Sequence, residues 1–147
     1  MGVKGKLIAS MEVKCGGHSI HDFFHTNTHQ IANISPTFIN RYEVHEGEIG
    51  KVGRVVNMKY NEAGQEKTVK CVIEAIDRYN KSISRKVIAG DLLEFYSSLT
   101  LVSSCEQQWI TWTLEYEKKI EDNPEPLNFL GFVLNVTKDV ESHLLKK

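Results

Sequence analysis

The stretch from Pro126 to Lys147, PLNFLGFVLNVTKDVESHLLKK, decides the fold. It is the one long segment with the spacing of an amphipathic helix, and about 20 residues at 1.5 Å each make a rod of roughly 30 Å. Pro124 and Pro126 mark its start, since proline is tolerated in the first turn of a helix. Its apolar surface is unusually broad and therefore needs a large partner surface. Two neighbouring stripes form this surface: Leu127, Leu130, Leu134, Thr137, Glu141 and Leu144, and beside them Phe129, Phe132, Val133, Val136 and Val140.

The chain before this helix has the patterns of strands and turns, so the partner surface should be a sheet. Residues 108–118 alternate most cleanly, with apolar side chains on one face and Thr or Glu on the other. Consecutive strands joined by short turns predict an antiparallel sheet with one buried face, which the helix would cover in an α+β fold. The predicted strands are residues 6–14, 38–45, 54–60, 66–77, 81–89, 92–103 and 108–118.

Two short helices are predicted between the first and second strands. Ser19 followed by Asp22 resembles a weak capping box at the start of one helix. Residues 26–28 can cap a second helix, which ends at Ile34 because the residue before Pro36 avoids the helical region.

Four histidines lie at helical spacing in this segment: His18, His21, His25 and His29. On one continuous helix they would share a face, and two of them could hold a metal. The alternative is a solvated polar face opposite Phe24. The break near Asn27 divides the four, so we expect no metal site.

Composition excludes several classes of function. The chain has 147 residues and a net charge of −1, which argues against non-specific electrostatic binding to nucleic acid. No apolar segment approaches the length of a membrane span, and the first residues lack the apolar core of a signal peptide. Cys15, Cys71 and Cys105 are odd in number and lack CxxC spacing, which favours free thiols in a reducing cytoplasm.

The glycine-rich stretch from Glu46 to Gly53 contains a Gly-Lys pair, so a phosphate-binding loop was considered. Val52 follows the lysine where that motif needs Ser or Thr, and the spacing from Gly47 to Gly50 is too short. A flexible hairpin turn is the better interpretation, and we expect no cofactor.

Short motifs spread along the whole chain share their order and spacing with a known family. They are Gly5-Lys6-Leu7, Glu46-Gly47 with Gly50 and Val52-Gly53, Lys59-Tyr60, Gly64 with Glu66-Lys67, Glu74-Ala75-Ile76-Asp77, Gly90-Asp91-Leu92, Thr111-Trp112-Thr113, Tyr116-Glu117-Lys118 and Thr137 to Glu141. On these residues the sequence resembles the plant major latex protein family, a branch of the birch pollen allergen and pathogenesis-related class-ten superfamily.

The resemblance implies one domain, residues 1–147, with a START-like helix-grip fold. In that fold a curved seven-stranded antiparallel sheet surrounds the long helix, and a V of two short helices supports the helix end. A cavity between sheet and helix takes up small apolar or amphipathic molecules in relatives. For this chain the resemblance implies such a molecule as partner, a role in plant defence, and a monomer or weak dimer.

Strand parity carried over from the superfamily predicts the cavity lining. On the sixth strand the family parity points Tyr96, Ser98 and Thr100 inward, whereas composition favours Phe95, Leu99 and Leu101; we follow the family. The predicted ligand-binding residues are Val56, Met58, Tyr60, Val69, Cys71, Ile83, Arg85, Tyr96, Ser98, Trp112, Leu114, Tyr116, Phe129, Phe132, Val133 and Val136. For each apolar position, plain core packing is the alternative.

Arg85 is the most informative of these residues, because an unpaired buried charge is costly. It either pairs with a carboxylate such as Glu94, extends its head to the rim, or anchors a ligand carboxylate or hydroxyl. Tyr60, Tyr96 and Tyr116 could supply hydroxyl anchors.

The sequence thus predicts an intracellular binder or carrier of small hydrophobic metabolites. The alternative is a cyclase or isomerase of a reactive terpenoid or alkaloid intermediate, which needs little more than a shaped, dry pocket and an acid such as a tyrosine. No catalytic constellation is evident, and ribonuclease activity, sometimes attached to the superfamily, lacks a basic patch.

Overall fold

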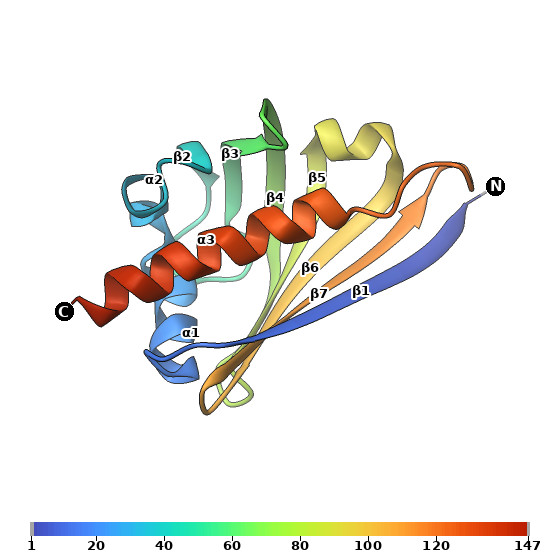
Figure 1. Ribbon diagram of the computed structural model, residues 1–147. Coiled ribbons are helices and arrows are strands. Elements are labelled where there is room, and N and C mark those ends of the chain that lie inside the picture. The colour runs from blue at the N-terminus through green and yellow to red at the C-terminus, as the bar shows by residue number, and fades with distance from the viewer. Residues whose placement is uncertain (1, 147) are drawn as a thin grey trace.

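In the computed structural model, which describes residues 2–146, a curved antiparallel sheet surrounds one long helix (Figure 1). The seven strands are β1 (Val3–Glu12), β2 (Ile39–Glu46), β3 (Val55–Glu62), β4 (Gln65–Asp77), β5 (Ser82–Gly90), β6 (Tyr96–Glu106) and β7 (Trp109–Lys118). Their order across the sheet is β1-β7-β6-β5-β4-β3-β2, so only the pairing of β1 with β7 joins strands that are distant in sequence. The predicted α+β architecture is confirmed, with strand ends displaced by a few residues.

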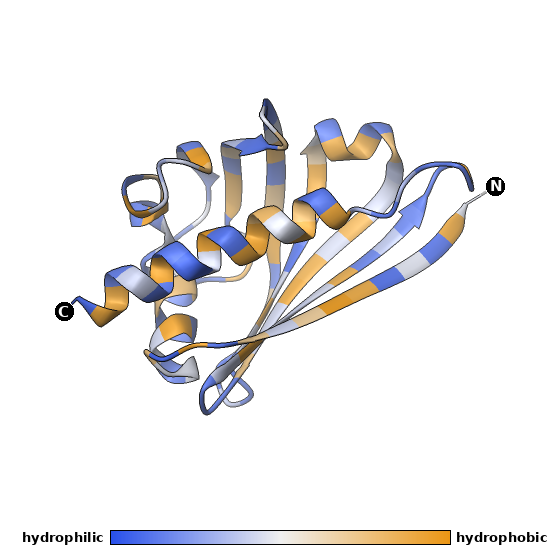
Figure 2. Cartoon of the chain, viewed as in Figure 1, coloured by the Kyte–Doolittle hydropathy of each residue, from blue (hydrophilic) through white to orange (hydrophobic). Residues whose placement is uncertain are grey.

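The long helix, α3 (Leu127–Leu145), crosses the concave face of the sheet. Val140 and Thr137 are fully buried, and the Thr137 hydroxyl donates to the Val133 carbonyl at 2.8 Å, which satisfies it inside the apolar interface. Leu127, assigned to the apolar stripe from the sequence, is instead 61% exposed at the first helical position, where α3 has not yet reached the sheet. Figure 2 shows apolar bands recurring along α3 and along the strands beneath it.

Gly131 within α3 allows a test of how closely the helix is packed. A Cβ added there would meet nothing within 4 Å, and alanine is favoured over glycine in a helix. We expect Gly131→Ala to raise the free energy of unfolding by about 0.5–1 kcal/mol in urea titrations. The matched Gly90→Ala variant should lower it, because Gly90 has φ 118° and its Cβ would overlap the Thr68 carbonyl. A loss of stability in Gly131→Ala would mean that α3 has a closer neighbour there.

Strand β7 has the alternation expected from its sequence. Ile110, Trp112, Leu114 and Tyr116 are buried beneath α3, and Trp109 on the opposite face is 48% exposed. The inward parity of the predicted residues on β3 also agrees with the structure, since Val56 and Tyr60 are buried.

Strand β6 differs from the sequence prediction at its beginning. Residues 91–94 form a 3-10 turn, η2 (Asp91–Glu94), and the strand starts only at Tyr96. A register shift between Tyr96 and Ser98 places both Tyr96 and Leu99 on the buried face. The inward assignment of Ser98 was therefore wrong, because the extra residue at this β-bulge turns its side chain outward, where it is exposed. The parity favoured by composition also fails at this point, because Phe95, which it placed inward, is 42% exposed.

The short helices between β1 and β2 are α1 (Gly17–Thr26), the 3-10 turn η1 (Thr28–Gln30) and α2 (Ile31–Ile34). The predicted break at Asn27 and the end at Ile34 are confirmed. The capping box at Ser19 was wrong, because α1 begins at Gly17, behind a glycine N-cap with no side-chain capping bond. Both helices contact α3, and the Ser35 hydroxyl after α2 donates to Asp139 of α3 at 2.6 Å.

Within residues 2–146, no helix is long and apolar enough to cross a membrane.

Candidate functional site

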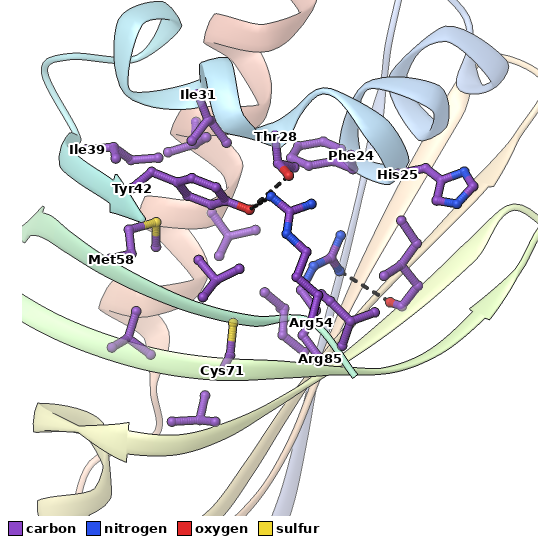
Figure 3. A pocket seen from close by; sticks show the side chains of 18 of the residues that line it. Phe24, His25, Thr28, Ile31, Ile39, Tyr42, Arg54, Met58, Cys71 and Arg85 are labelled. Carbon is purple, nitrogen blue, oxygen red and sulfur yellow. Dashed lines mark hydrogen bonds between the residues drawn. The ribbon is translucent and has the colours of Figure 1, made fainter. Parts of the chain in front are cut away.

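A cavity of about 120 Å³ lies between the sheet and α3, beneath α1 and η1 (Figure 3). It reaches the surface beside Lys51, whose side chain lines it and is exposed to solvent. An engineered apolar cavity of about 150 Å³ takes up benzene, so this space suits a compact group of that size. Of the sixteen predicted ligand-binding residues, eleven line the cavity, four are buried elsewhere and Ser98 is exposed on the outer face. The eleven are Val56, Met58, Val69, Cys71, Ile83, Arg85, Trp112, Phe129, Phe132, Val133 and Val136.

Four other predicted residues are buried outside the cavity. Leu114 packs in the core, and the Tyr60 ring lies 4.6 Å from that of Phe132. Tyr96 donates to the Pro124 carbonyl at 2.6 Å, in the segment that leads into α3. These positions, and Ser98 on the outer face, are therefore not part of the cavity wall.

Tyr116 belongs to a polar network at the same end of the sheet. Its hydroxyl donates to Glu125, whose carboxylate also accepts from the Lys118 ammonium at 2.6 Å. Burial and the bond to Glu125 raise the pKa of Tyr116 to about 12. The network fixes the segment before α3 and keeps this hydroxyl away from the cavity.

Trp112 forms part of the cavity wall and is only 2% exposed. Its ring meets Phe24 of α1 edge to face, with 5.4 Å between ring centroids. The guanidinium of Arg85 lies 5.1 Å from the centroid of the same ring. Trp112 thus connects the short helices, the sheet and the one charged side chain that was predicted to point inward.

Arg85 points into the cavity and does not form the ion pair with Glu94 that was one of its alternatives. Its Nη1 donates to the Ile83 carbonyl and to the Ser103 hydroxyl, both at 3.2 Å, and these are neutral acceptors. Its Nη2 is buried and has no hydrogen-bond partner within the described chain. Desolvation lowers the pKa of Arg85 from its ordinary value to about 10.

Arg54, which the sequence analysis did not assign to the site, is a second buried arginine in the cavity wall. It is 3% exposed, and its Nη2 donates to the Tyr42 hydroxyl at 3.0 Å. That hydroxyl in turn donates to the Thr28 hydroxyl at 2.8 Å, so a polar chain runs from β3 across β2 to η1 (Figure 3). Burial is also the main cause of the raised pKa of Tyr42.

The glycine-rich segment between β2 and β3 forms one side of the opening. Gly47, Gly50 and Gly53 all have positive φ, as expected for a tight turn. Gly50 accepts a 3.0 Å hydrogen bond from the His25 ring, which ties this segment to α1. Arg54 follows the turn directly, so the same backbone positions the opening and the buried charge.

Of the four histidines, only His21 and His25 have neighbouring rings, with 5.7 Å between the ring centroids. His18 pairs with Asp22 at 3.1 Å on the surface, His21 is buried, and His29 is exposed. Across residues 2–146 no group of three or more His, Cys, Asp or Glu side chains is placed to hold a metal ion. The absence of a metal site remains a prediction.

Comparison with known proteins identifies the family. The model of the pathogenesis-related protein Bet v 1 family matches residues 2–147. The chain belongs to the Bet v 1 family. Within it, the chain is 35% identical over 147 residues to MLP-like protein 43 of Arabidopsis thaliana, covering 96% of this chain and 93% of that protein. MLP-like protein 31 of the same plant is 33% identical over 149 residues, with 97% and 87% covered.

Two solved structures share the fold of this chain. Ginseng major latex-like protein 151 from Panax ginseng superimposes with a TM-score of 0.93 at 38% identity, covering 96% of this chain and 97% of that one. A norcoclaurine synthase from Thalictrum flavum, solved with dopamine and hydroxybenzaldehyde, has a TM-score of 0.81 at 16% identity, with 99% and 88% covered. At that identity the likeness shows the shared fold alone.

Proposed function

We propose that this protein binds and carries a small apolar or amphipathic molecule in the cavity between α3 and the sheet. The observation that carries the proposal is the cavity itself, whose wall combines aliphatic side chains from β3, β4 and β5 with the aromatic rings of α3 and Trp112. Such a wall favours an apolar body, and the few polar groups in it would fix the orientation. We further propose that the protein acts inside the plant cell, consistent with its free cysteines Cys15, Cys71 and Cys105.

The alternative, a cyclase or isomerase, needs an acid inside the cavity. Tyr60, Tyr96 and Tyr116, expected from the sequence as hydroxyl anchors, lie outside the cavity wall, and the hydroxyl of Tyr42, which does line the cavity, donates its proton to Thr28. No observation on these residues favours catalysis over binding, so we propose the binding function.

Quenching of tryptophan fluorescence tests the proposal directly. The Trp109→Phe variant leaves Trp112 as the sole tryptophan, and iodobenzene is a neutral, compact, heavy-atom quencher that matches the cavity in size. We expect iodobenzene to quench Trp112 with a saturable curve, because a bound molecule lies against the ring. The matched Trp112→Phe variant leaves the exposed Trp109, which should show only the linear quenching of random collisions. Linear curves of equal slope in both variants would contradict a binding cavity beside Trp112.

A further inference from the structure

The charged side chains around the cavity are all of one sign. Lys51, Arg54 and Arg85 line it, and among residues 2–146 no Asp or Glu belongs to its wall. The chain as a whole has 18 Lys and Arg against 19 Asp and Glu. Because the overall composition is balanced, this local excess of positive charge is a property of the site.

The two arginines of the cavity wall are held in place without being neutralised; Arg54 is buried, and Arg85 is half-buried with its Nη2 fully enclosed. Arg54 is held by the Tyr42 hydroxyl, and Arg85 by a carbonyl and a serine hydroxyl, so each bond has a neutral acceptor. Among the described residues no carboxylate lies within 4 Å of either guanidinium, the distance that would make an ion pair. Two desolvated positive charges therefore face a small apolar space with no counter-ion from the protein.

Each guanidinium also has an N–H donor without a hydrogen-bond partner among the described residues. Nε of Arg54 and Nη2 of Arg85 are both buried, and neither has a hydrogen-bond partner within residues 2–146. Buried polar atoms without partners are uncommon in folded proteins and call for a physical explanation. A ligand that brings acceptor oxygens and a negative charge would satisfy the donors and compensate the charge together.

Resting on the proposed binding function, we propose that the ligand is an organic monoanion: a carboxylate on a compact apolar body about the size of one aromatic ring. Arg85 is the main anchor, because its guanidinium carbon lies 5.1 Å from the Trp112 ring centroid and 5.8 Å from that of Phe24, and its Nη2 has no partner within residues 2–146. Arg54, at one end of the polar chain with Tyr42 and Thr28, contributes the second positive charge. The volume of about 120 Å³ suits a body of one ring.

Lys51 has a different role in this arrangement. Its ammonium is exposed and lies 3.1 Å from Glu48, so its charge is screened by water and by its partner. It can attract an anion toward the opening, but it does not define the buried site. This difference between Lys51 and Arg85 provides the matched control.

The test compares three probes of nearly equal shape by titration calorimetry: benzoate, benzamide and toluene. We expect benzoate to bind at least about tenfold more tightly than benzamide, since only the carboxylate compensates the buried charges. Arg85→Met should remove this preference and leave toluene binding within about twofold of wild type. Arg54→Met should reduce the preference as well, whereas Lys51→Met should keep it.

The outcomes separate this inference from the proposed function. Toluene binding with equal affinities for benzoate and benzamide would overturn the anion site and leave the apolar cavity standing. Failure of all three probes to bind would overturn both. A preference for benzoate that survives Arg85→Met, or that disappears in Lys51→Met, would place the anion at the surface and overturn the buried site. Thermal unfolding of each variant shows that it is folded, and Arg85→Met alone decides the question if Arg54→Met does not fold.

Discussion

Replacing Trp112 with alanine is expected to lower the free energy of unfolding by about 3 kcal/mol. The side chain is 2% exposed and holds Phe24 of α1 against the sheet, with 5.4 Å between the ring centroids. Removal of a buried tryptophan costs about 3–5 kcal/mol, and the existing cavity beside Trp112 places the loss at the lower end. Its indole Nε1 is buried and has no hydrogen-bond partner within residues 2–146, so the substitution removes no hydrogen bond.

Urea denaturation with a fixed m-value is the measurement for this variant. Trp109 lies on the same strand and is 48% exposed, so Trp109→Ala should stay within about 0.5 kcal/mol of wild type. Equal losses in the two variants would mean that the faces of β7 are assigned wrongly.

Replacing Arg85 with methionine is expected to have the opposite effect and to raise the free energy of unfolding of the ligand-free protein by about 2 kcal/mol. Burial lowers the pKa of Arg85 from its ordinary value to about 10, and such a shift corresponds to roughly 3 kcal/mol of unfavourable free energy for the charged form. Two long hydrogen bonds and the contacts with two aromatic rings offset part of that cost. Methionine keeps the apolar contacts and removes the charge.

The pH dependence of this gain follows from the direction of the shift. The folded pKa of Arg85 lies below the unfolded one, so the cost is complete below about pH 10 and is relieved only as the pH rises from there toward the unfolded pKa. The gain should therefore be constant between pH 6 and 8. Arg78→Met, at an exposed position in the turn after β4, should change the stability little. A marked loss of stability in Arg85→Met would mean that its bonds outweigh the uncompensated charge.

The fold was predictable because its decisive patterns are local. The alternation around Trp112 and the apolar stripes of α3 each occur within one element, and apart from Leu127 at the start of α3 both agree with the structure. The error at Ser98 has a different origin, since a single extra residue at the start of β6 reverses the parity there. Bulges leave little trace in sequence, so neither composition nor family parity could give the correct face on both sides of this one.

The candidate site was only partly predictable. Arg54 has the same parity as Val56 and Met58, so its inward direction could have been inferred from the sequence. Tyr42 follows a register shift near the start of β2 and could not have been assigned in the same way. Phe24 and Thr28 come from the short helices, and their positions above the sheet depend on tertiary packing. The sequence indicated one inward arginine, but the shared excess of positive charge appears only when the segment before β3, which carries Lys51 and Arg54, is brought next to Arg85 of β5.

The pairing of β1 with β7 also determines how the chain must fold. Val3 pairs with Lys118 and Glu12 with Trp109, so β1 finds its partner only after the strands between them have been synthesised. Closing so long a loop is entropically costly, and sheets with such distant contacts fold in roughly milliseconds to seconds. Until then Leu7 and Met11 lack the packing that covers them in the finished protein. We expect the pairing of β1 with β7 to form late in folding, and the interval before it forms to be the period when the chain is most prone to aggregate.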